Sequence, residues 1–412
     1  MNYSFFRIIF VFLRQKPIKK KMQVIKKESN YRINTHSSQE RVRGRKNVLS
    51  KLADIQWDFP NAKPSVLSNI HPYPAKFISE IPSNLIDCLW EGQGDFVLDP
   101  FCGSGSTLEA AQKFGIPSVG VDLNPIACLI SRVRTEACDK ELLSICQDII
   151  TSCKTSPLRG DVPSLPNIDH WFIPEIQQSL TRLKAEIDRY EESRYYDALC
   201  FCFSSIIVKV SNQDSDTRYA YRDKRRSSDD VFSYFHHSAK KLVSAKNDTP
   251  QAEVHVINKN TLKLNADDLP GSIGMVITSP PYPNAYEYWL YHKYRMYWLG
   301  YDPIAVKNEE IGARAKYFTK SSYDGYDFAG QMSTLLNILY PLCANGAYLC
   351  FVIGRSKIHG NIYNNDEIIS EAAAHSGYHH VTTLQRNMNN KRKSFNLTHA
   401  RIDKEYIVVL QK

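Results

Sequence analysis

The stretch from residue 96 to residue 122 constrains the fold more than any other part of the chain. Phe96–Asp99 is a short apolar run typical of a buried strand, residues 100–107 (PFCGSGST) form a glycine-rich turn, and a helix is predicted over 108–114. The next apolar run ends in Asp122. Glycines let a backbone approach a ligand closely, and the first N–H groups of a helix are free to bind it. This order of elements predicts an open α/β sheet with a nucleotide-type ligand at the turn.

The spacing of the glycines in this turn indicates which kind of cofactor is bound. Gly103 and Gly105 supply a Gly-x-Gly, but Leu108 and Glu109 stand where the dinucleotide fingerprint has its third glycine. This departure argues against a cofactor with a pyrophosphate. Asp122, at the end of the following strand, can accept hydrogen bonds from two ribose hydroxyls. The stretch therefore predicts a cofactor that carries a ribose.

A second strand is followed by a loop of unusual composition. Gly274–Ile277 is typical of a buried strand, and Thr278–Tyr282 (TSPPY) follows it, so the loop lies where open α/β sheets bind ligands. The two prolines have a fixed φ and no N–H to donate, which leaves carbonyls as acceptors. With a hydroxyl before them and an aromatic ring after them, they suit a planar exocyclic amine. A plain proline turn is the alternative, and the pentapeptide alone favours neither.

Apolar strands alternate with helical patterns along most of the chain, which predicts one α/β fold with a doubly wound, mostly parallel sheet. Further strands are expected at 253–257, 345–353 and 405–410. The middle third is different, because 141–150 and 175–190 carry helical periodicity. The apolar run 199–210 fits a helix or a strand, and its length favours a helix. Four regions are expected: a basic arm (1–50), a cofactor-binding half (51–138), a largely helical target-recognition insertion (139–252) and a catalytic half (253–412).

The polar segment 211–226 combines residue types that DNA-reading loops use. Arginines can bind guanine or phosphate, amides can read base edges, and tyrosines can stack. The candidate DNA-binding residues are Arg218, Tyr219, Arg222, Arg225 and Arg226. An ordinary exposed loop is the alternative, which the segment alone slightly favours.

The net charge of +9 is concentrated at the N-terminus, since residues 1–50 hold 13 Lys and Arg and two acids. Such an arm can neutralise nucleic-acid phosphates, or it can be a solvated disordered tail. The apolar run at residues 5–13 is too short to span a bilayer, and no cleavage site follows it. Because Met22 opens a segment that leads into the recognisable part, residues 1–21 can also be an incorrect start.

The ten cysteines have irregular spacings with no Cys-x-x-Cys pair, which indicates neither a disulfide framework nor a zinc site. We expect reduced thiols, a cytoplasmic location, no membrane association and no bound metal.

Two of these motifs together resemble a known family. Asp99–Gly105 (DPFCGSG) combined with Thr278–Tyr282 resembles the S-adenosylmethionine-dependent amino-methyltransferases that act on DNA, of the bacterial restriction–modification and orphan methylase type. The segments 71–77 (HPYPAKF) and 404–410 (KEYIVVL) are also similar to that family. The resemblance covers roughly residues 52–135 and 253–412.

The resemblance implies a set of site residues. The implied catalytic residues are Ser279, Pro280, Pro281 and Tyr282. The implied cofactor-binding residues are Tyr73, Lys76, Phe77, Asp99, Phe101, Gly103, Gly105, Asp122, Asn260 and Thr278. Among these, residues 71–77 are expected at the methionine end of the cofactor and Asp122 at the ribose. Asn260 stands where the family often has Asp at the adenine edge.

The resemblance further implies the substrate and partners. Ser rather than Asp or Asn before Pro-Pro-Tyr is similar to the N4-cytosine enzymes, so we expect methylation of the N4 amine of a cytosine flipped out of duplex DNA. Methylation of adenine N6 is the first alternative, and methylation of RNA or of a protein glutamine is the second. A non-catalytic DNA-binding protein is a third. Double-stranded DNA is the expected partner. A cognate restriction endonuclease is a possible second partner, and the sequence does not indicate whether one exists.

Overall fold

A seven-stranded sheet is the centre of the computed structural model, which describes residues 48–62, 66–74, 78–216, 218–246, 252–283, 286–317, 323–388 and 404–412. Its strands, in the order β10-β11-β7-β6-β1-β2-β5, are His379–Asn387, Lys404–Gln411, Cys343–Gly354, Ile273–Thr278, Phe96–Asp99, Ser118–Asp122 and Val254–Asn258. The first five in the chain (β1, β2, β5, β6 and β7) pair in parallel, and β11 runs antiparallel to both β7 and β10.

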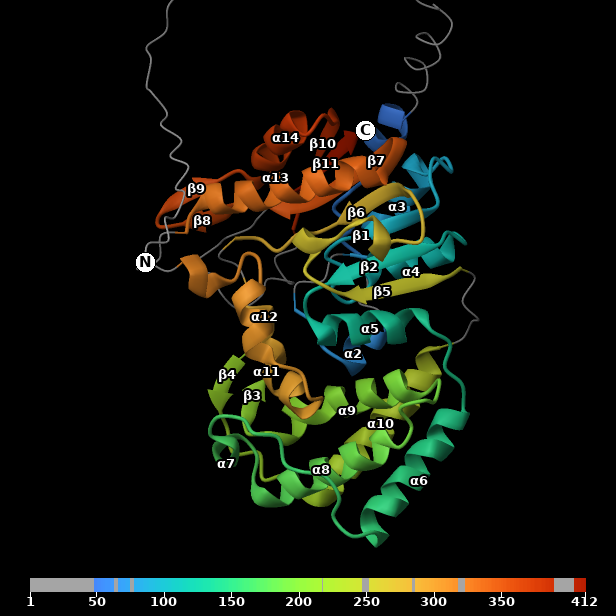
Figure 1. The fold of residues 1–412 in the computed structure, drawn as a ribbon, viewed down its shortest axis with the longest axis vertical. Helices are drawn as coiled ribbons and strands as arrows, with labels where there is room; N and C mark the ends of the chain where they lie inside the picture. The colour runs from blue at the N-terminus through green and yellow to red at the C-terminus, as the bar shows by residue number, and fades with distance from the viewer. Residues whose placement is uncertain are drawn as a thin grey trace, which may run out of the picture. The chain divides into compact units, whose positions relative to one another are not determined.

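Helices cover both faces of this sheet, so its central strands are apolar on both sides (Figure 1). On one face, α3 (Glu80–Leu89) and α4 (Ser106–Lys113) pack on alternate residues of β1 and β6 such as Val97 and Met275. On the other, α13 (Gly325–Leu342) and α14 (Asn365–His375) pack on the intervening residues, such as Leu98. This confirms the predicted doubly wound α/β fold.

The order of the strands reverses between β1 and β6. From β1 the chain proceeds outward to β2 and β5, and from β6 it proceeds the other way to β7. Loops at the carboxyl ends of β1 and β6 therefore diverge and leave a crevice, which is where open α/β sheets bind ligands. The cofactor loop predicted from the sequence follows β1, and the TSPPY loop follows β6.

Helices form most of the segment between β2 and β5. After α5 (Pro125–Thr135), which packs on β2 and β5, they are α6 (Glu141–Thr155), α7 (Ile168–Trp171), α8 (Pro174–Asp188), α9 (Tyr196–Val210) and α10 (Ser228–Ala245). The strands β3 (Gln213–Ser215) and β4 (Arg218–Tyr221) form a hairpin between α9 and α10. The predicted helices at 141–150, 175–190 and 199–210 are confirmed.

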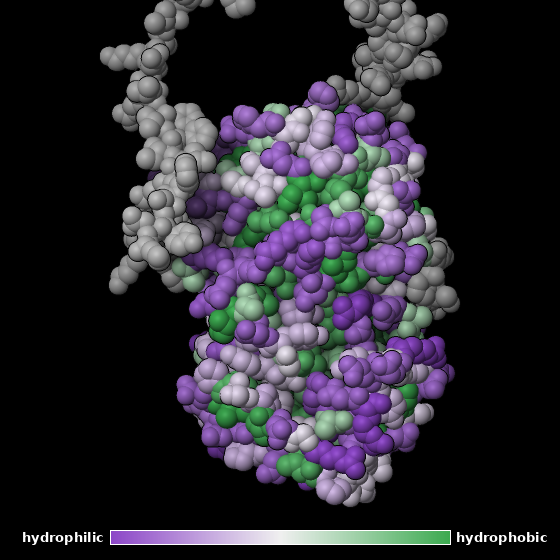
Figure 2. Space-filling model, in the orientation of Figure 1, coloured by the Kyte–Doolittle hydropathy of each residue, from purple (hydrophilic) through white to green (hydrophobic). Residues whose placement is uncertain are grey.

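One apolar core joins this helical segment to the helices after the TSPPY loop, α11 (Tyr288–Trp298) and α12 (Pro303–Glu309). Over the helical segment, the face seen in Figure 2 is largely hydrophilic with small apolar patches between. Short elements complete the fold: a helix at 48–53, α2 (Val66–Ile70), η1 (Thr261–Lys263), η2 (Ala266–Asp268), η3 (Arg314–Tyr317), β8 (Ser356–Ile358) and β9 (Asn361–Tyr363).

Residues 1–47 of the predicted basic arm lie outside the described residues. Among the helices that are described, none is long and apolar enough to cross a membrane.

Candidate active site

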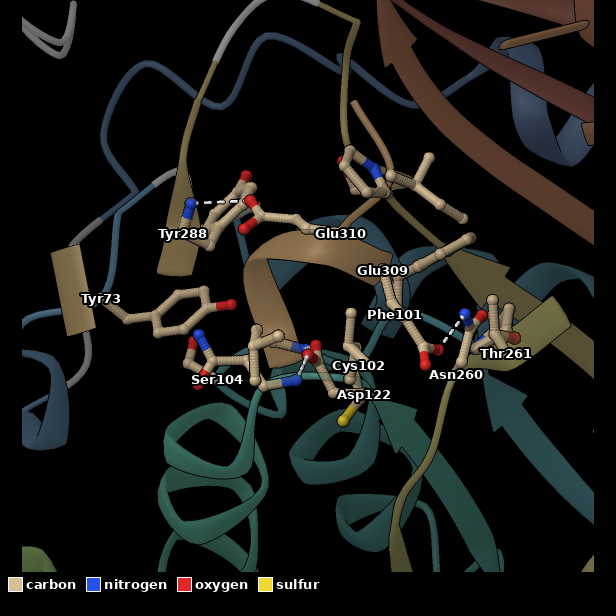
Figure 3. A pocket seen from close by; sticks show the side chains of 18 of the residues that line it. Tyr73, Phe101, Cys102, Ser104, Asp122, Asn260, Thr261, Tyr288, Glu309 and Glu310 are labelled. Atoms are coloured by element: carbon tan, nitrogen blue, oxygen red, sulfur yellow. Dashed lines mark hydrogen bonds between the residues drawn. The ribbon is translucent and has the colours of Figure 1, made fainter. Parts of the chain in front are cut away.

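A pocket opens at the carboxyl ends of the central strands, with about 820 Å³ of space including the part open to solvent (Figure 3). It is lined by the loop after β1, the end of β2, the turn after β5, the loop after β6 and residues of α11 and α12. The lining residues are Tyr73, Pro100, Phe101, Cys102, Gly103, Ser104, Ser106, Asp122, Leu123, Asn124, Asn260, Thr261, Ser279, Pro281, Tyr288, Val306, Glu309, Glu310 and Ile311.

The cofactor loop forms the floor of the pocket because its glycines adopt a left-handed backbone. Gly103 has φ +49° and Gly105 has φ +80°. A Cβ on Gly105 would lie 2.9 Å from Oγ of Ser131, so this glycine lets the loop pack against α5. Phe101 and Gly103 line the pocket, whereas Gly105 lies at the start of α4. The predicted loop is therefore present, with Gly105 shaping it from behind.

Asp122 ends β2 and faces the pocket. Its carboxylate accepts hydrogen bonds from the N–H groups of Gly103 (2.9 Å) and Asn124 (2.8 Å). Burial raises the pKa of Asp122 to about 6, against the lowering effect of these two donors. Each oxygen holds one backbone donor and keeps lone-pair capacity for another. The carboxylate is thus oriented by the protein and still able to accept hydrogen bonds from a ligand.

Asp99 and Thr278 are both buried beneath the pocket and are not among its lining residues. The Asp99 carboxylate accepts hydrogen bonds from the hydroxyls of Thr107 and Thr278, both at 2.6 Å, and from the Phe101 N–H at 3.1 Å. Burial raises its pKa to about 6. Asp99 therefore ties the cofactor loop, α4 and the end of β6 together, and its predicted contact with the cofactor stays a prediction.

The TSPPY loop contributes Ser279 and Pro281 to the pocket, while Pro280 is buried. Tyr282 packs partly into the apolar core, and its hydroxyl donates to Oε1 of Glu405 at 2.9 Å. Oε2 of Glu405 in turn accepts from Arg386 at 2.5 Å. The ring of Tyr282 is thus held by a carboxylate on β11 that sequence reasoning did not identify.

The segment 71–77 is described only in part. Tyr73 lines the pocket, and its ring stacks with the rings of Tyr288 (centroids 5.8 Å apart) and His292 (5.2 Å). Lys76 and Phe77 lie outside the described residues, so their predicted roles stay predictions.

Asn260 lines the pocket in the turn after β5, but both ends of its amide are engaged. Its oxygen accepts from the Leu262 N–H at 3.0 Å, and its nitrogen donates to Oε2 of Glu309 at 2.8 Å. A role at the adenine edge of a cofactor stays a prediction for this residue.

The roof of the pocket, defined as Tyr288, Val306 and Glu309–Ile311, was not identified from the sequence. Its most unusual member is Glu310, whose side chain is 6% exposed. The carboxylate accepts hydrogen bonds from the N–H groups of Tyr288 (2.7 Å) and Trp289 (3.0 Å) at the start of α11, and burial raises its pKa to about 8. Its sequence context, Asn-Glu-Glu-Ile-Gly, matches no general motif.

The candidate DNA-binding arginines lie on and after the β3–β4 hairpin. Arg218 and Arg222 both pair with Asp214, at 3.6 and 3.5 Å, and their side chains are 74% and 70% exposed. Arg225 pairs with Asp223, at 3.9 Å. These exposed guanidinium groups can exchange their carboxylate partners for phosphates, since surface ion pairs contribute little.

Two other candidates on or after this hairpin are more deeply engaged. The ring of Tyr219 stacks on Tyr294 of α11, and the two hydroxyls are hydrogen-bonded. Arg226 is 32% exposed and pairs with Asp230 at 3.7 Å. Asp216 forms an ion pair with the buried Arg295 of α11. The hairpin is therefore anchored to the helix that follows the TSPPY loop.

One thiol, that of Cys102, lines the pocket. Burial raises the pKa of Cys102 well above its usual range, which keeps the thiol protonated and a poor nucleophile. Among the described residues, no group of three or more His, Cys, Asp or Glu side chains is arranged to hold a metal ion.

Part of the chain is similar in sequence to DNA methylases. Residues 6–132 match the family model N6_N4_Mtase, described as DNA methylase. The chain is 27% identical over 183 residues to the Type II methyltransferase M.MjaII of Methanocaldococcus jannaschii, which is 42% of this chain and 34% of that protein. It is 46% identical over 55 residues to the Type II methyltransferase M.BsoBI of Geobacillus stearothermophilus, which is 13% of this chain and 11% of that protein. The chain thus spans about a third or less of the length of these two relatives.

Among solved structures, the rRNA methyltransferase aviRa from Streptomyces viridochromogenes is similar over 87% of this chain and 94% of its own, with 11% identity and a TM-score of 0.32. The sequence matches confirm the resemblance at the level of DNA methylases and imply S-adenosylmethionine as the methyl donor. The choice between cytosine N4 and adenine N6 stays a prediction.

The pocket fits such a cofactor by its own chemistry. Three carboxylates line it, at Asp122, Glu309 and Glu310, and no Lys, Arg or His is among its described lining residues. An acidic pocket with aromatic rings suits a ligand that carries cationic groups and a ribose.

Proposed function

We propose that the chain is a DNA methyltransferase that moves a methyl group from S-adenosylmethionine to the N4 amine of a cytosine flipped out of duplex DNA. One observation carries the proposal. Ser279 of the TSPPY loop and the glycine-rich loop with Asp122 line the same pocket, at the point where the strand order reverses. The similarity to DNA methylases supports the reaction class.

The floor residues would hold the cofactor. Asp122 would accept the ribose hydroxyls, and the left-handed turn at Gly103 would let the backbone approach the nucleoside. Bound S-adenosylmethionine supplies an activated methyl group. Asp99 would act indirectly, because its bonds to Thr107 and Thr278 fix the distance between the cofactor loop and the catalytic loop.

The TSPPY loop would hold the target amine. An exocyclic amine is conjugated with its ring and is a poor nucleophile. Hydrogen bonds from this amine to the Ser279 hydroxyl and to the Pro280 carbonyl would favour a pyramidal nitrogen with its lone pair available. Tyr282 would stack on the flipped base, and its bond to Glu405 would keep the ring in place. Positioning then supplies most of the rate enhancement.

Ser279 favours cytosine N4 as the target through the resemblance to Ser-Pro-Pro-Tyr enzymes. Methylation of adenine N6 is the alternative, since the related loops with Asp or Asn act on adenine. RNA and protein glutamine are further alternatives.

The exposed face of the β3–β4 hairpin would contact DNA. Arg218 and Arg222 are the best placed for phosphates, because both are more than two-thirds exposed and share one carboxylate partner. Tyr219 would support the hairpin from α11 and stack little on a base. Double-stranded DNA is accordingly the proposed partner, and a cognate restriction endonuclease is a further one.

The test is methyl transfer from labelled S-adenosylmethionine to duplex DNA, RNA and protein, followed by digestion of the DNA and mass spectrometry of the nucleosides. We expect label in DNA as N4-methylcytosine. N6-methyladenine as the sole product would overturn the choice of cytosine, and label in RNA or protein alone would overturn DNA as the substrate.

Single substitutions test whether the proposed catalytic residues carry out the methyl transfer. Ser279→Ala is expected to lower the transfer rate by about 100-fold, in the range that positioned polar groups contribute, while DNA retention on a filter is kept. Ser370→Ala, on the remote helix α14, is the matched control and should transfer at the wild-type rate. Unchanged transfer by Ser279→Ala would refute the catalytic assignment.

Arg222→Ala tests the proposed DNA contact. It should weaken the retention of DNA and reduce the slope of log affinity against log salt concentration by about one, as for the loss of one phosphate contact.

A further inference from the structure

One corner of the pocket combines two aromatic rings with a buried carboxylate. Tyr73 and Tyr288 lie with ring centroids 5.8 Å apart and planes inclined by 21°, and both line the pocket. Glu310 lies beside Tyr288 and is bonded to its backbone (Figure 3). Rings and a carboxylate together are the groups that bind an organic ammonium ion, by cation–π attraction and by charge-assisted hydrogen bonds.

This corner is at the end of the pocket away from Asn260. Figure 3 shows Tyr73, Tyr288 and Glu310 on one side, Asp122 near the middle, and Asn260 with Glu309 on the other side. A nucleoside whose ribose is held by Asp122 can extend its base toward one end and its 5′ substituent toward the other. The 5′ substituent of S-adenosylmethionine ends in an amino acid, which carries an ammonium group.

The burial of Glu310 and the charges around it argue that this residue binds a ligand in addition to capping α11. A carboxylate that only caps a helix is usually exposed to water, where it costs little to keep charged. Glu310 is 6% exposed, faces the negative Asp122 and Glu287, and has Lys316 bonded to its backbone carbonyl rather than to its carboxylate. Within the described part of the chain, its carboxylate oxygens accept hydrogen bonds from two backbone N–H groups and form no ion pair. A buried carboxylate held in this way is costly to ionise, and a bound ammonium ion would lower that cost.

The geometry points to Glu310, together with the rings of Tyr73 and Tyr288, as the subsite for the α-ammonium group of the cofactor. This inference rests on the proposed function, which supplies the cofactor, and it adds a residue that neither motif contains. The carboxylate would also link the bound cofactor to α11, because the same side chain holds the start of that helix.

Binding calorimetry with four adenosyl ligands tests the assignment without any methyl transfer. S-adenosylhomocysteine carries the ammonium group but a neutral sulfur, and its des-amino analogue lacks the ammonium. Methylthioadenosine lacks the whole amino acid, and S-adenosylmethionine adds the charge on sulfur. In Glu310→Gln we expect affinity for S-adenosylhomocysteine and S-adenosylmethionine to fall equally, by about 10- to 100-fold, as for a lost charged hydrogen bond. Affinity for methylthioadenosine and the des-amino analogue should stay within about twofold of wild type.

Two patterns of affinity loss in Glu310→Gln would contradict this assignment. A loss for S-adenosylmethionine alone would overturn the inference, because the carboxylate would then face the sulfonium. An equal loss for all four ligands would also overturn it, because Glu310 would then only cap α11. Glu309→Gln is the matched control at the opposite end of the pocket, and it should change the affinities for S-adenosylhomocysteine and methylthioadenosine by the same factor. If the wild-type chain binds none of these ligands, the proposed function itself fails.

Discussion

The floor and the roof of the pocket are both built around acidic residues, but they are held in different ways. In the floor, Asp122 is fixed by N–H groups of Gly103 and Asn124, both part of the continuous stretch that runs from β1 to α5. In the roof, Glu310 is fixed by N–H groups of Tyr288 and Trp289, at the far side of a loop and helix. The floor is therefore set by local chain geometry, and the roof depends on how α11 and α12 pack.

Because floor and roof are held in different ways, we expect them to contribute differently to cofactor binding and to methyl transfer. A floor that forms with the sheet can bind the nucleoside end of a cofactor in nearly the same geometry at all times. The helix α11, which carries Tyr288 of the roof, also contacts the hairpin. Tyr294 is hydrogen-bonded to Tyr219, and Arg295 forms an ion pair with Asp216. The contacts proposed between the hairpin and DNA would thus affect the helix that carries Tyr288 of the roof. Binding of the cofactor should depend most on the floor, and the rate of transfer should be more sensitive to the roof.

The largest expected effect is in the floor. Asp122→Ala removes the proposed acceptor for the ribose hydroxyls and also leaves the Gly103 N–H without its carboxylate partner, which should loosen the cofactor loop. Affinity for S-adenosylhomocysteine, measured by calorimetry, should fall by at least about 100-fold, since two charged hydrogen bonds are lost. Asp87→Ala on the exposed side of α3 is the matched control and should bind as wild type. An affinity within about threefold of wild type for Asp122→Ala would remove Asp122 from the site.

An intermediate effect is expected where the roof and the TSPPY loop meet, at Gly312. This residue has φ +73°, and a Cβ there would lie 3.0 Å from the Tyr282 carbonyl oxygen and 3.1 Å from that of Pro281. Gly312→Ala should therefore displace the TSPPY loop and lower kcat by about 10-fold, while affinity for S-adenosylhomocysteine changes by less than about threefold.

The control for this substitution is Gly330→Ala on α13, where an added Cβ meets no atom within 4 Å. Alanine favours the helix there, so the free energy of unfolding should rise by about 0.5–1 kcal/mol and kcat should not change. A parallel loss of kcat and of cofactor affinity in Gly312→Ala would show that floor and roof do not act separately.

The same difference explains what could be predicted from the sequence. The floor follows from a local pattern, because a strand, a Gly-x-Gly turn and a helix bring Gly103 and Asp122 together wherever they occur. Parallel strands then bring Ser279 to the same edge of the sheet. Residue type alone could not separate Asp122, which faces the pocket, from Asp99, which is buried beneath it. Both end a strand before a loop, and only their surroundings distinguish them.

The roof could not be predicted, because no periodicity marks a glutamate that becomes buried through long-range packing. Glu310 and Glu405 look like surface residues in the sequence, next to other charged or polar residues. Their burial results from the placement of α11 and α12 over the pocket and of β11 beside β7. The helices α10 and α13 are not among the elements predicted from the sequence. In α13 the residues Gly325, Gly330 and Pro341 weaken the helical pattern, whereas α10 has a capping box at Ser227 that could have marked its start.

The smallest effect is a change in how stability depends on pH. The pKa of Glu310 is raised by burial from 4.5 to about 8 in the folded protein, so the folded state binds the extra proton between these values. Its contribution to stability is therefore fully present below about pH 4.5 and is lost as the pH rises through about 8. Asp122 and Asp99, with pKa values of about 6, act in the same direction but at lower pH. Between about pH 5 and 8 the cofactor-free wild type should lose stability more steeply than Glu310→Gln, by roughly 1 kcal/mol per pH unit, and the two slopes should converge above about pH 9. Chemical denaturation at several pH values measures both slopes. Equal slopes would show that the carboxylate of Glu310 is already ionised in the empty pocket, and the roof would then carry a charged carboxylate as the floor does.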